Sequence, residues 1–351
     1  AVFIYFMNYK LICFLLAETP RHKKGAGEAL KTAPTKNAPH YFEASVPRQL
    51  TISREEISVN KKTGDLFFKM YQPDIMLAEA RFELEDLFSH KTIEFKEEVS
   101  KKLREILKKK NGKDIEHSSE EYSVYAVSGY QGDPEQFLTE KSIVASLLKS
   151  EKIALDPKEI DYTLSSSLKY AKNDMVILDW DGAIIFDPQG DIESTIEMLE
   201  LANLQLLRYR LLDRELDRRL SQITKLIRES PDRAKFLFGA KEMNRAIKNV
   251  VLIRSTSISE FQSVEKEIKL IGDWYSARLF DLAAKKFKIE SWREDIKDKL
   301  EALEDVYTVA SERFTNSWER RAKIFETVGW YILIIGWIIF LFLDFYNFFV
   351  K

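Results

Sequence analysis

Cysteine and histidine are scarce in this sequence, and their scarcity excludes several kinds of site. The 351 residues include one cysteine, Cys13, and four histidines. A single cysteine excludes an internal disulfide framework and a structural zinc site built from cysteines. The histidines lie in the first third of the chain and never at metal-ligand spacing: His22, His40, His90 and His117. A histidine-rich metal site or a serine–histidine triad in the C-terminal half is therefore excluded, and we expect no metal or other cofactor.

An excess of charge of one sign is also absent. The chain has 54 Lys and Arg against 56 Asp and Glu, which gives a formal net charge of −2. Domains that bind nucleic acid usually carry a strongly basic surface. The sequence also lacks the phosphate-binding loop, the G-x-G-x-x-G fingerprint and the H-E-x-x-H zinc motif. We therefore expect no nucleic-acid partner, and none of these motifs assigns a catalytic, cofactor-binding or metal-binding residue.

Apolar residues are concentrated near the C-terminus. The segment 328–349 contains the charge-free run VGWYILIIGWIIFLFL. As a helix it would be about 33 Å long at about 1.5 Å per residue, close to the hydrocarbon thickness of about 30 Å. Trp330, Tyr331 and Tyr346 stand near its two ends, where such rings favour the bilayer interface. We expect residues 327–351 to form one transmembrane anchor; the alternative is a helix buried in a core.

Basic residues are unequally distributed around this segment. Arg313, Arg320, Arg321 and Lys323 precede it, whereas only Lys351 follows it. Under the positive-inside rule, the N-terminal body would face the cytosol or the mitochondrial matrix. The sequence thus predicts a single-pass, tail-anchored membrane protein that contacts the lipid bilayer through residues 328–349.

A second apolar segment, AVFIYFMNYKLICFLLAE, opens the sequence. It is interrupted by Asn8 and Lys10, and no small-residue cleavage site follows it. If translation began at Met7, the remainder would be a minimal signal peptide. We favour a buried strand over Tyr9–Ala17, while a signal or a second membrane segment within residues 1–17 stays open.

Residues 1–190 mix strand and helix patterns. The part from 20 to 50 holds four prolines and is expected to be a flexible loop. Elsewhere the two kinds of element interleave without a regular βαβ repeat, so we expect an α+β domain. Strands are expected at Leu66–Tyr71, Asp74–Leu84 and Tyr122–Tyr130, and helices at 91–110 and Pro134–Ser150.

After residue 190 the pattern becomes helical. Residues 191–228 lack proline and glycine and form an amphipathic pattern that ends before Ser230–Asp232 and Gly239. A second helix is expected over 259–288. A third begins near Ile289 with apolar or small residues every seven positions, at Ile289, Ile296, Leu303, Ala310, Ser317 and Ile324.

This heptad pattern favours a coiled coil or an antiparallel bundle over residues 191–326. The helices 191–228 and 289–326 could pair within one chain, or they could mediate self-association or bind a protein partner. No proline or glycine interrupts the third helix before Gly329, so we expect it to continue into the membrane span.

One segment could carry chemistry. Met175–Phe186 reads MVILDWDGAIIF, with apolar runs on both sides of Asp181–Gly182, which is typical of a β-hairpin. The same residues resemble the D-x-D-G motif of haloacid-dehalogenase-like phosphatases. That resemblance implies a magnesium-dependent phosphatase in which Asp179 attacks phosphorus and Asp181 acts as general acid and base.

The hairpin interpretation is favoured over the phosphatase. Ala183 stands where the phosphatase motif usually has threonine, and the sequence after the motif is mostly helical rather than strand-forming. We therefore expect Asp181–Gly182 to be a tight turn, with Asp179 on an exposed strand face.

The order of the parts resembles a known family. An α+β domain, the hairpin MVILDWDGAIIFD, a helical region and one C-terminal anchor look like the required-for-meiotic-nuclear-division family. The resemblance implies a membrane-tethered, oligomeric organiser that is not an enzyme. From it and from the patterns above, we expect a membrane-anchored scaffold or interaction protein that acts through its helical region.

Overall fold

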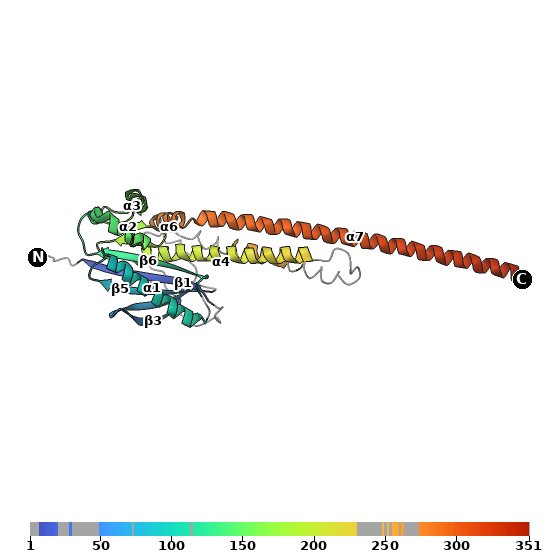
Figure 1. Cartoon of the computed structure of the whole chain (residues 1–351), viewed down its shortest axis with the longest axis horizontal. Coiled ribbons are helices and arrows are strands. Elements are labelled where there is room, and N and C mark those ends of the chain that lie inside the picture. Colours follow the sequence, from blue (N-terminus) through green and yellow to red (C-terminus); the bar gives the residue numbers. More distant parts are fainter. Residues whose placement is uncertain are drawn as a thin grey trace. The chain divides into compact units, whose positions relative to one another are not determined.

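A mixed sheet of nine strands organises the N-terminal part of the chain in this computed structural model (Figure 1). The strands lie in the order β2-β3-β4-β5-β1-β6-β9-β8-β7. All neighbours are antiparallel except β6 and β9, which are parallel. The strands are β1 (Asn8–Glu18), β2 (Glu28–Ala29), β3 (Gln49–Val59), β4 (Lys62–Tyr71), β5 (Ile75–Leu84), β6 (Ser119–Ser128), β7 (Ser167–Leu168), β8 (Met175–Leu178) and β9 (Gly182–Phe186).

The structure describes most of the chain, in two units. The described residues are 7–19, 28–29, 49–71, 74–112, 115–229, 248, 251–252, 255–259, 261–262 and 274–350. The first unit comprises residues 1–214 and 260–296, and the second comprises 215–259 and 297–351. Most of the predicted loop 20–50 and the predicted helix break at Ser230–Asp232 and Gly239 lie outside the described residues.

The strand predicted at Tyr9–Ala17 is confirmed, and it is central to the sheet. β1 pairs with β5 on one side and with β6 on the other. Every residue from Leu11 to Ala17 is buried, because helices cover both faces of the sheet at this point. Burial on both faces explains why the segment is continuously apolar instead of alternating.

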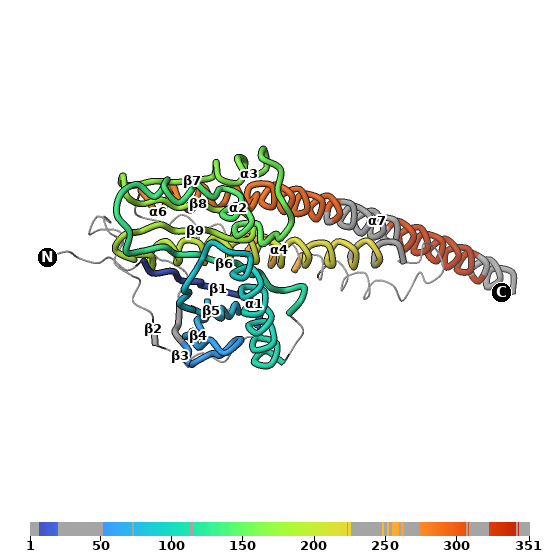
Figure 2. The backbone as a smooth tube through the Cα atoms, turned by 60° about the vertical axis from the view of Figure 1, so that its left-hand side comes forward, coloured from blue at the N-terminus to red at the C-terminus, as the bar shows by residue number. Residues whose placement is uncertain are grey.

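The first face of the sheet is covered by α1 (His90–Asn111) and α2 (Lys141–Lys149), and α1 runs beside β1 and β5 (Figure 2). The helix predicted at 91–110 is confirmed. It ends at Gly112, whose positive φ of 63° allows its N–H to donate to the Lys108 carbonyl.

The helix predicted at Pro134–Ser150 is correct only in part. Residues Pro134–Glu140 form a 3-10 helix, η1, which begins where the Asp133 carboxylate accepts from the Glu135 N–H. Only Lys141–Lys149 is α-helical. A further short helix, α3 (Pro157–Leu164), packs against α2.

The second face is covered by the first half of α4 (Glu193–Glu229) and by α6 (Trp274–Lys286). Phe287, directly after α6, meets the Tyr122 ring of β6 edge to face at 5.6 Å. The long helix predicted over 191–228 is thus confirmed. Of the helix predicted over 259–288, the structure describes a short stretch near residue 260 and then α6 itself.

Helix α7 (Ile289–Val350) is one continuous helix of 62 residues. Its course confirms that the third predicted helix continues through Gly329 without a break. In the second unit, Lys299 of α7 forms a salt bridge of 2.7 Å with Asp217 of α4. Leu216 of α4 and Leu303 of α7 are both fully buried there.

Candidate functional site

The turn between β8 and β9 places Asp179, Trp180 and Asp181 at the end of a two-strand hairpin. The two strands are antiparallel, and the Asp179 N–H donates to the Gly182 carbonyl at 2.8 Å. Gly182 lies against β6, because a Cβ built on it would be only 2.9 Å from the Ser123 carbonyl oxygen. The predicted hairpin is confirmed, and its glycine is required by this close approach.

The prediction that Asp179 lies on an exposed strand face is wrong. Its residue exposure is 4%, because α2 and α6 both reach across the end of the hairpin. Its Oδ2 is 3.2 Å from Lys149 Nζ of α2, and its Oδ1 is 3.2 Å from Lys286 Nζ of α6. The Asp179 carbonyl accepts from the Tyr122 hydroxyl at 3.0 Å. This aspartate therefore ties two helices to the sheet.

The phosphatase alternative would require carboxylates that are available to magnesium. Burial raises the pKa of Asp181, although Lys96 opposes the shift. A phosphatase site would also use a further aspartate from later in the chain. Of two such candidates, Asp281 is exposed, and Asp273 lies outside the described residues. Within the described part of the chain, no three His, Cys, Asp or Glu side chains are grouped so as to hold a metal ion. The Asp179 carboxylate instead forms salt bridges with the ammonium groups of Lys149 and Lys286.

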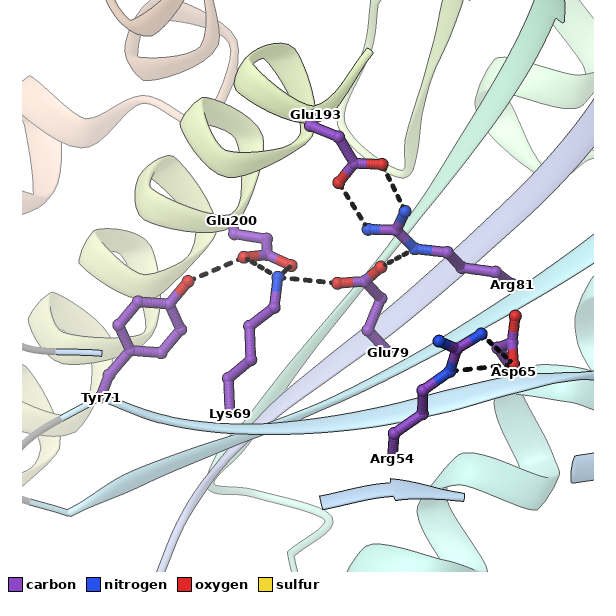
Figure 3. A network of polar contacts seen from close by, with 8 residues as sticks. All are labelled: Arg54, Asp65, Lys69, Tyr71, Glu79, Arg81, Glu193 and Glu200. Atoms are coloured by element: carbon purple, nitrogen blue, oxygen red, sulfur yellow. Dashed lines mark hydrogen bonds and ion pairs between the residues drawn. The ribbon is translucent and has the colours of Figure 1, made fainter. Parts of the chain in front are cut away.

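A second cluster, which sequence reasoning missed, lies between the sheet and α4 (Figure 3). We call it the buried ionic network. It joins four side chains of β4 and β5 to two glutamates of α4. Its members are Lys69, Tyr71, Glu79, Arg81, Glu193 and Glu200.

Lys69 lies at the centre of the buried ionic network. Its Nζ is 2.8 Å from Glu79 Oε2 and 2.8 Å from Glu200 Oε1. The Tyr71 hydroxyl donates to Glu200 Oε2 at 2.8 Å. Glu79 and Glu200 are fully buried, so these contacts replace the water that both carboxylates lose on folding.

Arg81 extends the buried ionic network to the start of α4. Its Nε donates to Glu79, and its Nη2 donates to Glu193 Oε2 at 2.9 Å. Glu193 lies in the first turn of α4, where a carboxylate is also favoured by the helix dipole. Because Glu193 and Glu200 are seven residues apart, they project from one side of α4 and fix its rotation and its position along the sheet.

The two buried glutamates have opposite pKa shifts. Burial raises the pKa of Glu200, and Lys69 opposes this only in part. For Glu79, burial also raises the pKa, but Lys69, a hydrogen bond with Glu200 and Arg81 together leave the pKa lowered. The difference follows from the cations nearby in the described part of the chain: Glu200 contacts only Lys69, whereas Glu79 contacts both Lys69 and Arg81.

The sequence contained a signal for this cluster. Lys69 interrupts the apolar run LFFKMY, and Glu200 lies in an apolar stretch of α4. A charge inside an otherwise apolar run indicates a buried partner when both faces of the sheet are covered. The partner itself was not predicted, because the packing of α4 on the sheet could not be inferred locally.

An open depression of about 580 Å³ lies beside the network. Two arginines line it, but Arg54 donates to Asp65 at 3.0 Å and Arg81 is held by Glu79 and Glu193. Each guanidinium is neutralised by carboxylates, so the depression offers no obvious anion site. Its lining residues are Arg54, Glu55, Glu56, Thr63, Gly64, Asp65, Arg81 and Glu83.

The C-terminal part of α7 exposes a continuous apolar surface. The window Lys323–Leu341 has a mean hydropathy of 2.0, and none of it is buried within the protein. Leu333 and Trp337, for example, are 67% and 70% exposed. By length and composition, this is one helix able to cross a membrane.

The chain is similar to known sequences over most of its length. The sequence model of the family described as "Uncharacterized protein MJ0711, N-terminal domain" matches residues 16–193, just over half of the chain. The chain is also 29% identical over 276 residues to "Uncharacterized protein MJ0711" of Methanocaldococcus jannaschii, covering 78% of this chain and 80% of that protein. No solved structure matches. The family match covers β2 to β9 and the helices among them, and on this basis the chain belongs to the MJ0711 N-terminal domain family.

Proposed function

We propose that this protein is a membrane-anchored scaffold or interaction protein, held in a bilayer by residues 328–349 of α7. The observation that carries the proposal is the apolar surface of α7. Water-soluble proteins rarely expose a contiguous apolar surface of this extent. Burying one large apolar side chain is worth about 1.5–3 kcal/mol, so a bilayer that covers the whole segment would bind it strongly.

The orientation follows from the flanking charges. Four basic residues precede the span in sequence, which supports a body on the cytosolic or matrix side. An anchored body is confined to the membrane surface, and confinement raises its effective concentration for partners on the same surface.

The helical region is the proposed contact for partners. In the second unit, α4 and α7 are joined by the Lys299–Asp217 salt bridge, and buried leucines lie on both helices. The heptad of α7 supports coiled-coil packing, either within one chain or with a partner helix. The relationship to the required-for-meiotic-nuclear-division family stays a prediction, and it agrees with this role.

Extraction of membranes at high pH tests the anchor. We expect the full chain to stay with the membrane, because alkali removes proteins held only by surface charge. Leu333→Arg combined with Ile338→Arg should move most of the protein to the soluble fraction, since each arginine near the bilayer centre costs about 2.5–3.5 kcal/mol. Thr308→Arg, in an exposed part of α7 outside the span, is the matched control. Extraction of the unaltered chain would overturn the proposal.

The alternative proposal, a magnesium-dependent phosphatase using Asp179 and Asp181, has less support from the geometry. Asp179 is paired with two lysines, and β8 is followed by an antiparallel strand. Magnesium-dependent turnover of a phosphate ester by the purified chain would favour it, provided that Asp181→Asn abolishes the activity and leaves the melting temperature unchanged.

A further inference from the structure

Among the described residues, the outer edge of β3 is paired only near its start. β3 has eleven residues, but its pairing with β2 involves only Leu50 and Thr51. From Ser53 to Val59 it pairs with β4 on its inner side. No strand in the described ranges pairs with its outer side there. A strand with an open edge has backbone donors and acceptors available to another strand.

The turn after β3 determines which backbone groups point outward. Asn60 and Lys61 both have positive φ values, 48° and 67°, as in a two-residue type I′ turn. In such a hairpin the flanking residues, Val59 and Lys62, exchange two hydrogen bonds, and alternate residues before them also bond to β4. The outward-facing N–H and C=O groups therefore belong to Arg54, Glu56 and Ser58.

The side chains of this edge are self-complementary in one register. In an antiparallel pair of two β3 strands centred on Glu55, Arg54 of each copy lies opposite Glu56 of the other. Both residues are on the outward-bonding positions, so each such pair also exchanges two backbone hydrogen bonds. Centring the pair on Glu56 instead would place two Glu56 carboxylates opposite each other, which is unfavourable.

We propose that two copies of this chain pair through the outer edges of β3, antiparallel and centred on Glu55, to form one continuous sheet. The outward orientation of the backbone groups supplies the hydrogen bonds. The order Arg54-Glu55-Glu56 selects the register.

The edge also has features that usually prevent strands from pairing. Their positions limit the proposed pairing to the part of β3 that follows the bulge. Charged residues and bulges protect natural edge strands. Here the bulge lies between Thr51 and Ser53, at the start of this part and not inside it. The two Glu55 side chains would face each other, but Lys110 Nζ lies 3.0 Å from Glu55 Oε1 in each copy and compensates the charge.

The pairing does not depend on the proposed anchor. All of the residues involved belong to the first unit, whereas the apolar span belongs to the second. A bilayer would favour the pair by raising the local concentration of the chain. Failure of pairing and failure of anchoring therefore give separate results: the first appears in cross-linking, the second in alkaline extraction.

Disulfide cross-linking of the full chain in detergent micelles tests the proposal. The two copies of residue 55 would form a non-hydrogen-bonded pair with Cα atoms about 4.5 Å apart, which suits a disulfide. Glu55→Cys should give a covalent dimer under mild oxidation. Ser58→Cys is the control, since its two copies would be about 20 Å apart at about 3.3 Å per residue. Cys13 is only 1% exposed and should not contribute.

Charge reversal tests the register in the Glu55→Cys background. Arg54→Glu should reduce the dimer yield at least about fivefold, because it places like charges opposite each other twice. Adding Glu56→Arg should restore the yield. The Arg54–Asp65 salt bridge is exposed, with side chains 65% and 49% accessible, so folding should be little affected, and melting curves verify this. Absence of the Glu55→Cys dimer, or equal cross-linking of Ser58→Cys, would overturn the proposal.

Discussion

Two regions of the molecule depart from the usual distribution of polar and apolar residues, and they do so in opposite ways. One is the interface between the sheet and α4, and the other is the C-terminal part of α7. At the first, the ionisable groups of Glu79 and Glu200 are inside the protein, and the half-buried Lys69 lies between them. At the second, side chains such as Leu333 and Trp337 are apolar groups outside it. The buried charges have partners within the chain, whereas the exposed apolar groups have none within the described protein.

The difference indicates what stabilises the unusual residues in each region. A buried carboxylate is tolerated when cations and donors replace its water, and Lys69, Arg81 and Tyr71 do so here. An exposed apolar helix requires a bilayer or another protein to cover it. The first unit is therefore self-sufficient around its ionic network, while α7 depends on its surroundings. Variants in the network should change stability, and variants in the span should change location.

The largest effect on stability is expected from Lys69→Met. The substitution leaves two buried carboxylates without their shared cation, and removal of one partner from such a cluster costs about 3–5 kcal/mol. Hydrogen exchange of the β4 and β5 amides in the full chain measures the loss. Lys152→Met breaks the exposed Lys152–Glu97 salt bridge and should cost about 0–1 kcal/mol. Equal effects of the two variants would show that the network is not a buried structural element.

A smaller effect is expected from Asp179→Asn. The amide keeps the shape of the side chain but loses the charge that holds Lys149 and Lys286, and we expect a cost of about 1–3 kcal/mol. Protection of the α6 amides from exchange should decrease more than that of β1. If α6 protection does not change, then Asp179 does not hold this helix on the sheet.

The smallest effect is the dependence of stability on pH through Glu200. Its pKa is raised on folding, so its contribution is fully present below the ordinary glutamate value of about 4.3 and is lost as pH rises through the raised pKa. Glu79 has a lowered pKa, so its contribution is lost on acidification. Glu200→Gln should remove the alkaline loss of stability and leave the acidic loss. Melting temperatures of the two proteins across this range measure the difference. An unchanged alkaline loss in Glu200→Gln would assign that loss to another group.

Local patterns in the sequence predicted many elements of the fold. Period-two and continuous apolar runs located β1, β4 and β5, and the 3.6-residue period located α1 and α4. Asp181–Gly182 correctly indicated a hairpin between β8 and β9, although Gly182 is the first residue of β9 and does not lie in the turn. These features depend on neighbours in sequence, which is why they can be read without a structure.

The remaining features depend on contacts between distant segments. Asp179 was expected to be exposed because its burial comes from Lys149 and from Lys286, which is 107 residues away. The parallel pairing of β6 with β9 was not predicted, and neither was the arrangement that brings Glu200 to Lys69. Each requires knowledge of which helix covers which face. The charges at Lys69 and Glu200 within apolar runs were the available signal.

The central claim is that the apolar part of α7 lies in a bilayer, and the accessibility of a single cysteine tests it most directly. The full chain carrying Cys13→Ser and Ile335→Cys is reconstituted in vesicles and treated with a water-soluble maleimide, with Thr308→Cys in the same Cys13→Ser background as the control. The account predicts labelling of Thr308→Cys in intact vesicles, and labelling of Ile335→Cys only after detergent and denaturant are added. Rapid labelling of Ile335→Cys in intact vesicles would contradict it.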